Sequence, residues 1–329
     1  MAVEFRVMPD PLQNMATEML QKVHLPTADA EFIAQCLVQV DLRGIFTHGT
    51  HQLGSGHTRN GGYVGEFLRG NLNPHPDVQV VKETGVFTLL DGDGGSGYLA
   101  ARKAVQTAID KAGDQGIAIS TTRFHGHVGS AGIYARMALH HNLVTFSVAG
   151  GRWWEPPNRE NATVWDAMRS PPMCFGIPSD DGPPFVVDMN TNFFGGRDQL
   201  EKVMVNYPGP IFKSMGLRFV SWILGGALAG DIEPSDRVSA YPGANRGYLI
   251  VAIHPDVVGS ADTFKQEVGR IMDACRQMDP IKGQATAETP GSLEWRRERE
   301  WSKEGIPIGD EHRKLLEKVA ADLSVDVPW

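Results

Sequence analysis

Cysteine is scarce in this chain of 329 residues, and its three cysteines, Cys36, Cys174 and Cys275, lie far apart without C-x-x-C spacing. An odd number of scattered cysteines argues against structural disulfides and favours a reducing compartment. Long apolar runs are missing as well, because the best candidate, residues 217–228, falls short of the roughly 18 uninterrupted apolar residues of a membrane span. The opening segment MAVEFRVMPD has early acids and no apolar run, so we expect no signal peptide and a cytoplasmic location.

Positive charge is in the minority, with 31 Lys and Arg against 39 Asp and Glu and a net charge of −8. This balance argues against nucleic acid as the main partner, because phosphate binding needs a basic face. The concentrated basic run Arg296-Arg297-Glu298-Arg299 is interleaved with acids, and we interpret it as a solvated helix face. An anionic ligand would therefore need a local pocket of cations, amides or imidazoles.

Familiar nucleotide-binding and hydrolase motifs are absent too. The string Asp91-Gly-Asp-Gly-Gly-Ser-Gly comes nearest to G-x-G-x-x-G, but its glycines are wrongly spaced and no acid follows at the expected distance. The chain has no P-loop and no G-x-S-x-G elbow. A Rossmann dinucleotide site is therefore not expected.

The chain does contain an alternation of helical and strand patterns, and its length corresponds to roughly two domains of about 150 residues. We expect helices, the second of them capped by Thr27, at residues 11–23, 27–40, 98–113, 129–139, 214–230, 260–278 and 310–324. We expect strands at residues 78–81, 85–90, 116–120, 144–149, 184–188 and 248–254. Residues 54–62 and 151–172 have the composition of loops. This alternation predicts an α/β protein.

Histidines stand beside glycine at two junctions between expected elements, in Thr47-His48-Gly49-Thr50-His51 and in His125-Gly126-His127-Val128-Gly129. Glycine lets a ligand approach closely, and an imidazole beside a hydroxyl is suited to proton transfer near neutral pH. Surface or capping histidines are the alternative. A metal site made by both clusters is another alternative, although no acidic ligand sits beside either cluster.

Two further polar residues stand at the ends of expected elements. Asp188 ends a strand, where ligands often bind in open α/β sheets, but it could equally cap the next turn through Asn190 or Thr191. Lys213 precedes the 214–230 helix and could serve as a cation for an anionic ligand or simply be exposed.

Several longer strings carry a specific resemblance, and they occur in one order along nearly the whole chain. The strings are Asp41-Leu-Arg-Gly-Ile-Phe-Thr-His-Gly, Leu90-Asp-Gly-Asp-Gly-Gly-Ser-Gly-Tyr, His127-Val-Gly-Ser-Ala-Gly-Ile-Tyr-Ala, Val187-Asp-Met-Asn-Thr-Asn, Lys213-Ser-Met-Gly-Leu, Ile223-Leu-Gly-Gly-Ala-Leu-Ala-Gly, Leu249-Ile-Val-Ala-Ile-His-Pro, Pro290-Gly and Gly305-Ile-Pro-Ile. They resemble the malate/L-lactate dehydrogenase family that lacks a Rossmann fold, of which this chain looks like a divergent member.

The resemblance implies an α/β subunit with the non-Rossmann sulfolactate-dehydrogenase-like fold, in which a helical N-terminal part packs on a mixed-sheet body. Residues 1–75 with 245–329 would form the scaffold part and residues 76–244 the cofactor-binding part, usually within a homodimer. The family binds NAD or NADP and passes a hydride between the nicotinamide and a small 2-oxo or 2-hydroxy acid, or a related imino acid. No metal is implied.

The resemblance also assigns roles to residues. His48 would donate or accept the substrate proton, with Thr47 as its hydroxyl partner. The residues expected to contact the cofactor are His127, Gly129, Ser130, Ala131, Ser170, Asp188, Met189, Asn190 and Lys213.

Four departures from the family pattern leave the substrate and the activity open. The family places a carboxylate-binding arginine four residues after the catalytic histidine, where this chain has Gln52, and a neutral amide cannot supply a charged fork. Arg59, on the glycine-bounded loop that follows, could replace it at the substrate. A block with a G-W-A pattern is missing between Asn192 and Lys213, Trp222 replaces an acid, and residues 151–170 are longer than usual. A homologue without hydride transfer that binds a small ligand or partner, and a His-ligated metal enzyme, therefore remain as alternatives.

Overall fold

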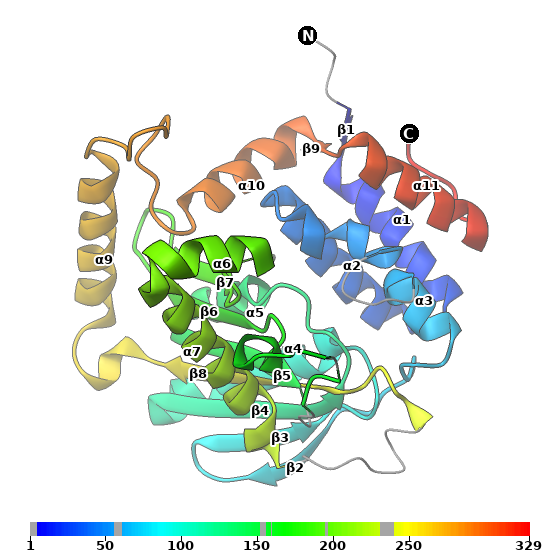
Figure 1. Ribbon diagram of the computed structural model, residues 1–329, viewed down its shortest axis with the longest axis horizontal. Helices are drawn as coiled ribbons and strands as arrows, with labels where there is room; N and C mark the ends of the chain where they lie inside the picture. Colours follow the sequence, from blue (N-terminus) through cyan, green and yellow to red (C-terminus); the bar gives the residue numbers. More distant parts are fainter. Residues whose placement is uncertain (1–4, 56–60, 152–155, 159, 195–196, 231–239) are drawn as a thin grey trace.

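The computed structural model describes residues 5–55, 61–151, 156–158, 160–194, 197–230 and 240–329. A seven-stranded sheet forms the body of the molecule (Figure 1). In spatial order its strands are β2 (Gln79–Glu83), β3 (Phe87–Asp91), β4 (Ile117–His125), β8 (Arg246–Ile253), β5 (Val144–Gly151), β6 (Pro172–Ile177) and β7 (Phe185–Asn190).

The sheet is mixed, because β3 and β4 pair in parallel while all the other neighbouring strands pair antiparallel. β8, which comes late in the chain, inserts between β4 and β5. Its register sets Arg246 opposite Gly151 on one side and His125 on the other. Because of this insertion, the first residue of β8 lies beside the last residues of β4 and β5, which lead into the histidine and glycine motifs.

Helices cover the two faces of the sheet, and the period-two pattern of β8 determines which side chains meet them. Tyr248, Ile250 and Ala252 join the main core with α4 (Gly97–Gln115) and α5 (Gly132–Leu139). Leu249 and Val251 on the other face pack with the side chains of α7 (Pro208–Gly225). A strand buried on both faces explains why residues 248–253 form an almost continuous apolar run.

A helical unit packs beside the sheet, across the top and along the right side of Figure 1. Its members are α1 (Pro9–Lys22), α2 (Thr27–Leu42), α3 (Gly62–Leu68), α10 (Ser292–Glu304) and α11 (Asp310–Leu323). The short strands β1 (Arg6–Val7) and β9 (Ile306–Pro307) pair antiparallel and bring the two ends of the chain together. Arg43, after α2, makes a two-pronged salt bridge with Glu298 on α10. The predicted division at residues 75/76 and 244/245 stays a prediction.

Most expected elements are present, but several boundaries were wrong. The helix expected at 214–230 begins at Pro208, ends at Gly225 and is followed by a short 3-10 turn, Ala227–Ala229. Thr27 is the first residue of α2 rather than its cap, and its hydroxyl accepts a hydrogen bond from the Gln21 amide. The elements that the sequence patterns missed are α3, α6 (Arg197–Asn206), α10, β1, β6 and β9.

The charged run 296–299 lies on a helix, α10, but only Arg296 and Arg299 are on a solvated face, because Glu298 is half-buried against Arg43. Arg296 forms an ion pair with Glu288, and the Arg299 guanidinium lies over the Trp295 ring. α9 (Ala261–Arg276), whose first turn is capped by the Ser260 hydroxyl, stands at the left edge in Figure 1.

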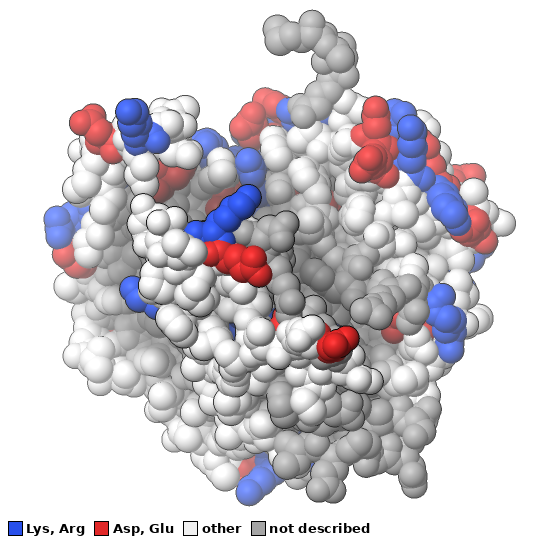
Figure 2. Space-filling view, viewed as in Figure 1, with Lys and Arg blue, Asp and Glu red and all other residues white. Residues whose placement is uncertain are grey.

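One described helical stretch, Pro208–Ala229, is by length and composition long and apolar enough to cross a membrane, although its best apolar stretch, residues 217–228, is shorter than a span. In the fold it packs on the sheet: a Cβ on Gly225 would lie 2.5 Å from backbone atoms of Ala149 and Gly150. The absence of a side chain at Gly225 therefore permits the close packing of α7 on the sheet. Charged side chains are few over α7 in the face shown in Figure 2, where the helix leaves apolar side chains exposed.

Candidate active site

A cavity of about 450 Å³ opens beside the turn that follows α2 and the ends of four strands, β5, β6, β7 and β8. This volume is in the range of about 300–1,000 Å³ that is typical of small-molecule sites. Its walls contain these residues singled out in the sequence: Thr47, His48, His127, Gly129, Ser130, Ala131, Ser170, Asp188, Met189 and Asn190. The fold thus brings to one place residues that are up to 143 positions apart, from Thr47 to Asn190 (190 − 47).

The segment that carries His48 is fixed from behind by a buried carboxylate. Asp41, on α2, accepts hydrogen bonds from the Thr50 backbone amide at 2.9 Å and from the Thr50 hydroxyl at 2.5 Å. Gly49 passes so close that a Cβ there would lie 1.7 Å from the Asp41 Oδ1 atom. The motif Asp41-x-x-x-x-x-x-His48-Gly49 is therefore explained by packing: the acid holds the turn and the glycine makes room for the acid.

His312, on α11, completes this network. Its Nε2 lies 3.0 Å from the Thr50 hydroxyl, which already donates to Asp41, so Nε2–H is the donor to Thr50. Burial raises the pKa of Asp41 to about 7, against the lowering effect of its hydrogen bonds to Thr50. Burial, with a smaller contribution from the charge of His51, lowers the pKa of His312 to about 4. The wall behind His48 therefore holds two groups whose pKa values have moved in opposite directions.

Thr47 and His48 line the cavity, and Gln52 fixes the backbone at Thr47. The Thr47 Oγ1 lies 3.1 Å from the His48 Nδ1. Gln52 is only 1% exposed, and its amide donates to the Thr47 carbonyl oxygen. Gln52 thus lies behind the cavity wall rather than on it.

His127 has a tautomer that its neighbours determine. Its Nδ1 lies 2.7 Å from the Tyr63 hydroxyl and 3.2 Å from the Gly129 backbone N–H, which can only donate. Because Nδ1 accepts, the proton of the neutral ring is on Nε2. Gly129 adopts φ +74°, and a Cβ there would lie 2.2 Å from the Tyr98 hydroxyl, so glycine is needed at this turn.

Asp188, at the cavity-facing end of β7, is bound to the start of α5. Its Oδ2 accepts from the Ser130 hydroxyl at 2.5 Å and from the Gly132 backbone N–H at 2.7 Å. The alternative that Asp188 caps its own turn through Asn190 or Thr191 is therefore wrong. Arg136, one turn further along α5, lies close to this carboxylate; burial lowers the pKa of Arg136 to about 10, and the charge of Asp188 opposes that lowering.

Among the cavity residues that were not singled out as ligand contacts in the sequence, Arg169, Arg246 and Trp222 have the largest side chains. Arg246 is half-buried at the start of β8, and Arg169 is exposed before β6. Trp222 replaces the family acid, and its ring lies against the end of β5, since a Cβ on Gly151 would be 2.1 Å from it. Arg246 could have been noticed because it stands just before an apolar strand. The predicted strand began at residue 248, however, so Arg246 was assigned to the preceding loop.

One predicted cofactor contact, Lys213, lies away from the cavity and is exposed on α7. Arg59 lies outside the described residues.

His125 is buried at the end of β4, where its Nε2 lies 2.6 Å from the Thr122 hydroxyl and its Nδ1 lies 2.8 Å from the Gly126 carbonyl oxygen. Within the described residues no group of three His, Cys, Asp or Glu side chains is arranged to hold a metal ion.

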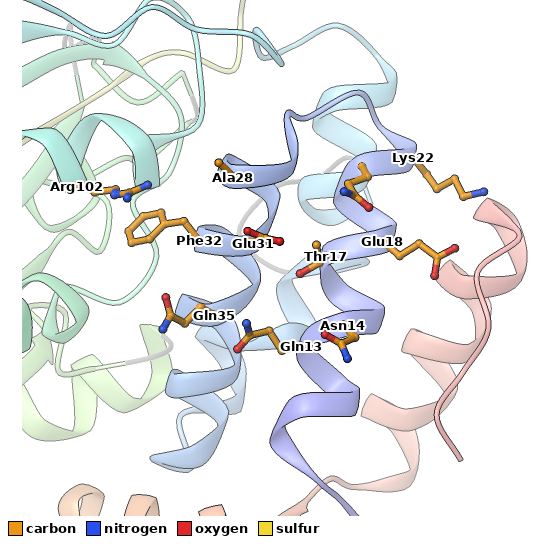
Figure 3. Close-up of a pocket in the computed structure, with 11 residues that line it drawn as sticks. Gln13, Asn14, Thr17, Glu18, Lys22, Ala28, Glu31, Phe32, Gln35 and Arg102 are labelled. Atoms are coloured by element: carbon orange, nitrogen blue, oxygen red, sulfur yellow. The ribbon is translucent and has the colours of Figure 1, made fainter.

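A second hollow, of about 970 Å³, lies between α1 and α2 (Figure 3). Its walls carry mainly long polar side chains, including Gln13, Glu31 and Gln35, and the Arg102 guanidinium lies 4.4 Å from the centre of the Phe32 ring. It contains no histidine and no glycine-bounded turn. The chemistry is therefore concentrated in the smaller cavity.

Comparisons with known proteins find one family over nearly the whole chain. The family model for malate/L-lactate dehydrogenase matches residues 7–195 and 195–317. The malate dehydrogenase of Pyrococcus horikoshii is 33% identical over 361 residues, which cover 95% of this chain and 93% of that protein. A solved structure of malate dehydrogenase from Pyrococcus horikoshii OT3 superposes with a TM-score of 0.82 at 25% identity and covers 98% of this chain and 97% of that chain.

Two further relatives act on other compounds, according to their names. The L-sulfolactate dehydrogenase of Methanocaldococcus jannaschii is 24% identical over 356 residues, covering 97% of each chain. The NAD(+) ureidoglycolate dehydrogenase of Escherichia coli O157:H7 is 23% identical over 337 residues, covering 93% of each. Together with the fold, these matches define the class of protein as an oxidoreductase that acts on CH–OH groups. Within that class, the chain belongs to the malate/L-lactate dehydrogenase family, and the predicted resemblance and non-Rossmann α/β fold are confirmed.

Proposed function

We propose that this protein transfers a hydride between NAD(P) and a small 2-oxo or 2-hydroxy acid, or a related imino acid, in the cavity beside His48. The observation that carries the proposal is that His48, in the turn after α2, and His127, just after β4, line one cavity with ring centroids 5.8 Å apart. A catalytic imidazole and a hydrogen-bond donor on either side of a small molecule suit a reaction that moves a proton and a hydride together.

His48 is the residue proposed to give and take the substrate proton. An imidazole is the side chain best suited to proton exchange near neutral pH. The contact between its Nδ1 and the Thr47 hydroxyl fixes the ring, so that Nε2 can face the substrate oxygen. Gln52 and Asp41 hold this segment in place through the Thr47 carbonyl and Thr50.

The wall formed by residues 127–131 and 188–190 suits the nicotinamide end of the cofactor. A carboxamide needs both donors and acceptors, and this wall offers the His127 Nε2–H, the Asn190 side chain and the main chain of a glycine turn. The Cβ that Gly129 lacks leaves space at this turn. When bound, the cofactor supplies or accepts the hydride; the protein's task is to orient it and to exchange the proton at His48.

Cofactor titration tests the proposal without relying on turnover. NADH and NADPH are titrated into wild type, His127→Ala and the control His141→Ala, with nicotinamide fluorescence as the readout. His141 is exposed beyond α5 and away from the cavity. We expect saturable binding in wild type, weaker binding in His127→Ala, and no change in the control; equal binding in all three would contradict the cofactor placement.

The alternative of a homologue without hydride transfer is separated by the same titration. Tight cofactor binding without turnover on any of a panel of 2-oxo acids would favour it. For the metal-enzyme alternative, stoichiometric zinc or iron in purified protein would be required.

The resemblance further supports a homodimer, and the chain's composition supports a cytoplasmic location. We propose both. Exposed apolar side chains on α7, among them Phe212, Val220 and Ile223, are consistent with a partner subunit. The mass of the protein in solution, measured by light scattering, tests the dimer; a monomeric mass at all concentrations would contradict it.

A further inference from the structure

The ionisable side chains of the cavity carry an unbalanced positive charge. Its lining contains two arginines, Arg169 and Arg246, and one carboxylate, Asp188. This local excess stands in a chain whose net charge is −8. A cavity lined in this way attracts an anion.

Asp188 does not neutralise the two arginines, because it is already engaged elsewhere. Its Oδ2 accepts hydrogen bonds from Ser130 and Gly132, and the charge of Arg136, on the same helix as Gly132, interacts with it. The carboxylate therefore belongs to the start of α5.

The other inward-lying arginines of the fold have partners. Arg43 is paired with Glu298, Arg123 with Asp91, and the Arg218 Nε donates to the Arg169 carbonyl oxygen. Within the part of the chain that the structure describes, the guanidinium groups of Arg246 and Arg169 make no hydrogen bond or ion pair. A half-buried guanidinium without a partner is costly unless a ligand satisfies it.

Arg246 is held at a defined place by the sheet. Its Cα is paired with Gly151 on β5 and with His125 on β4, so the backbone beneath it is fixed on both sides. Burial and the nearby charge of Arg169 lower the pKa of Arg246 to about 10, which leaves it charged at neutral pH. Arg169 is exposed at the mouth of the same cavity.

We propose that Arg246, assisted by Arg169, binds the carboxylate of the substrate, in place of the arginine that the family motif has at the position of Gln52. This inference rests on the proposed function, since it names the residues that select an acid for that same cavity. A guanidinium binds a carboxylate through two parallel hydrogen bonds, which an amide cannot reproduce. Gln52 is unavailable for this task because it is buried and donates to the Thr47 carbonyl.

The experiment measures carboxylate binding and cofactor binding separately. Oxalate and oxamate, which cannot be reduced, are titrated calorimetrically into the NADH-loaded or NADPH-loaded protein, and NAD(P)H is titrated alone. The variants are Arg246→Ala, Arg246→Lys, Arg169→Ala and Arg59→Ala, with Arg270→Ala as the control. Arg270 is exposed on α9 and pairs with Glu267.

We expect Arg246→Ala to weaken oxalate binding and to raise KM for a 2-oxo acid by roughly 10–150-fold, the range for a lost charge-assisted pair. Arg169→Ala has a smaller effect, Arg246→Lys recovers part of the loss, and NAD(P)H affinity changes less than about twofold because the cofactor does not use this subsite. Thermal unfolding checks that each variant is folded. If Arg246→Ala does not fold, oxalate binding is compared between wild type, Arg246→Lys and Arg169→Ala. Unchanged oxalate binding in both of these variants overturns the inference.

Other outcomes contradict the assignment in distinct ways. If NAD(P)H binding weakens as much as oxalate binding, the arginines hold a cofactor phosphate instead. If Arg59→Ala abolishes oxalate binding while Arg246→Ala leaves it unchanged, Arg59 is the carboxylate ligand. If wild type binds no NAD(P)H but oxalate binding to the cofactor-free protein still requires Arg246, the proposed function fails while the anion subsite stands.

Discussion

The Tyr63 hydroxyl lies 2.7 Å from the Nδ1 of His127 and thereby links the helical unit to the wall of the cavity. Tyr63 is buried on α3, and burial raises the pKa of its hydroxyl, so it stays protonated and can donate at any physiological pH. This contact helps keep the His127 proton on Nε2, the atom proposed to donate into the cavity.

The first prediction removes that link. Tyr63→Phe deletes one donor to Nδ1, while Gly129 still supplies the other. We expect NAD(P)H affinity to fall by roughly 2–10-fold, the range of one neutral hydrogen bond, and kcat to change little. Fluorescence titration measures the affinity. Unchanged affinity in Tyr63→Phe together with a large loss in His127→Ala would mean that Tyr63 does not orient the ring.

The second prediction concerns the proton carrier. In His48→Ala, kcat should fall by roughly 10²–10⁴-fold, the usual range for a general acid–base group. Cofactor affinity should stay at the wild-type value, because His48 faces the substrate in this account. Steady-state rates and cofactor titration are measured on the same preparation. Wild-type turnover in His48→Ala would remove His48 from the mechanism.

The third prediction follows from the opposed pKa shifts of Asp41 and His312. The pKa of Asp41 rises from 3.8 to about 7, so the folded state binds more protons and its stability falls as pH rises from about 4 to 7. The pKa of His312 falls from 6.5 to about 4, so the unfolded state binds more protons and stability rises with pH from about 4 to 6.5. In wild type the two slopes oppose each other.

Single substitutions should therefore reveal the two slopes. Between pH 4 and 6.5, Asp41→Asn should gain stability as pH rises, and His312→Gln should lose it, each by on the order of 2–4 kcal/mol relative to the flatter wild-type profile. Urea unfolding at a series of pH values gives the free energies. Parallel profiles for wild type and both variants would show that these groups do not titrate as the burial indicates.

The fourth prediction tests the packing of the His48 turn. Gly49→Ala places a Cβ against Asp41, so the turn must shift, and we expect a loss of about 2–4 kcal/mol in unfolding free energy together with a lower kcat. Gly209→Ala on α7 is the matched control, since nothing lies within 4 Å of its added Cβ. Equal stability of the two variants would mean that the turn can relax without cost.

Sequence patterns could locate much of the site because its residues stand at element ends. His48, His127 and Asp188 each sit beside glycine or at a strand terminus, and such positions are visible in one sequence. Their partners were not visible. Tyr63, His312 and Arg246 come from distant segments, and only the fold shows that they meet the cavity or the wall behind it.

Two of the elements that the sequence patterns missed, α10 and β6, also lack a clear local pattern. α10 carries charge on most of its surface and buries only Ser292 fully, so it shows no apolar period to read. β6 begins at a proline and lies beside an edge strand, and it followed a segment read as irregular. Lys213 was expected just before a helix that starts at residue 214, but α7 starts at Pro208, so Lys213 lies within the helix, where it is exposed.

The measurement that tests the central claim most directly follows the hydride itself. Reduced cofactor carrying deuterium at the transferable position of the nicotinamide is incubated with the protein and a panel of small 2-oxo acids, and the products are analysed by mass spectrometry. The account predicts a 2-hydroxy acid with deuterium on C2, formed by wild type and Tyr63→Phe but almost not at all by His48→Ala. Product without deuterium, or no product from any acid despite saturating cofactor, would contradict it.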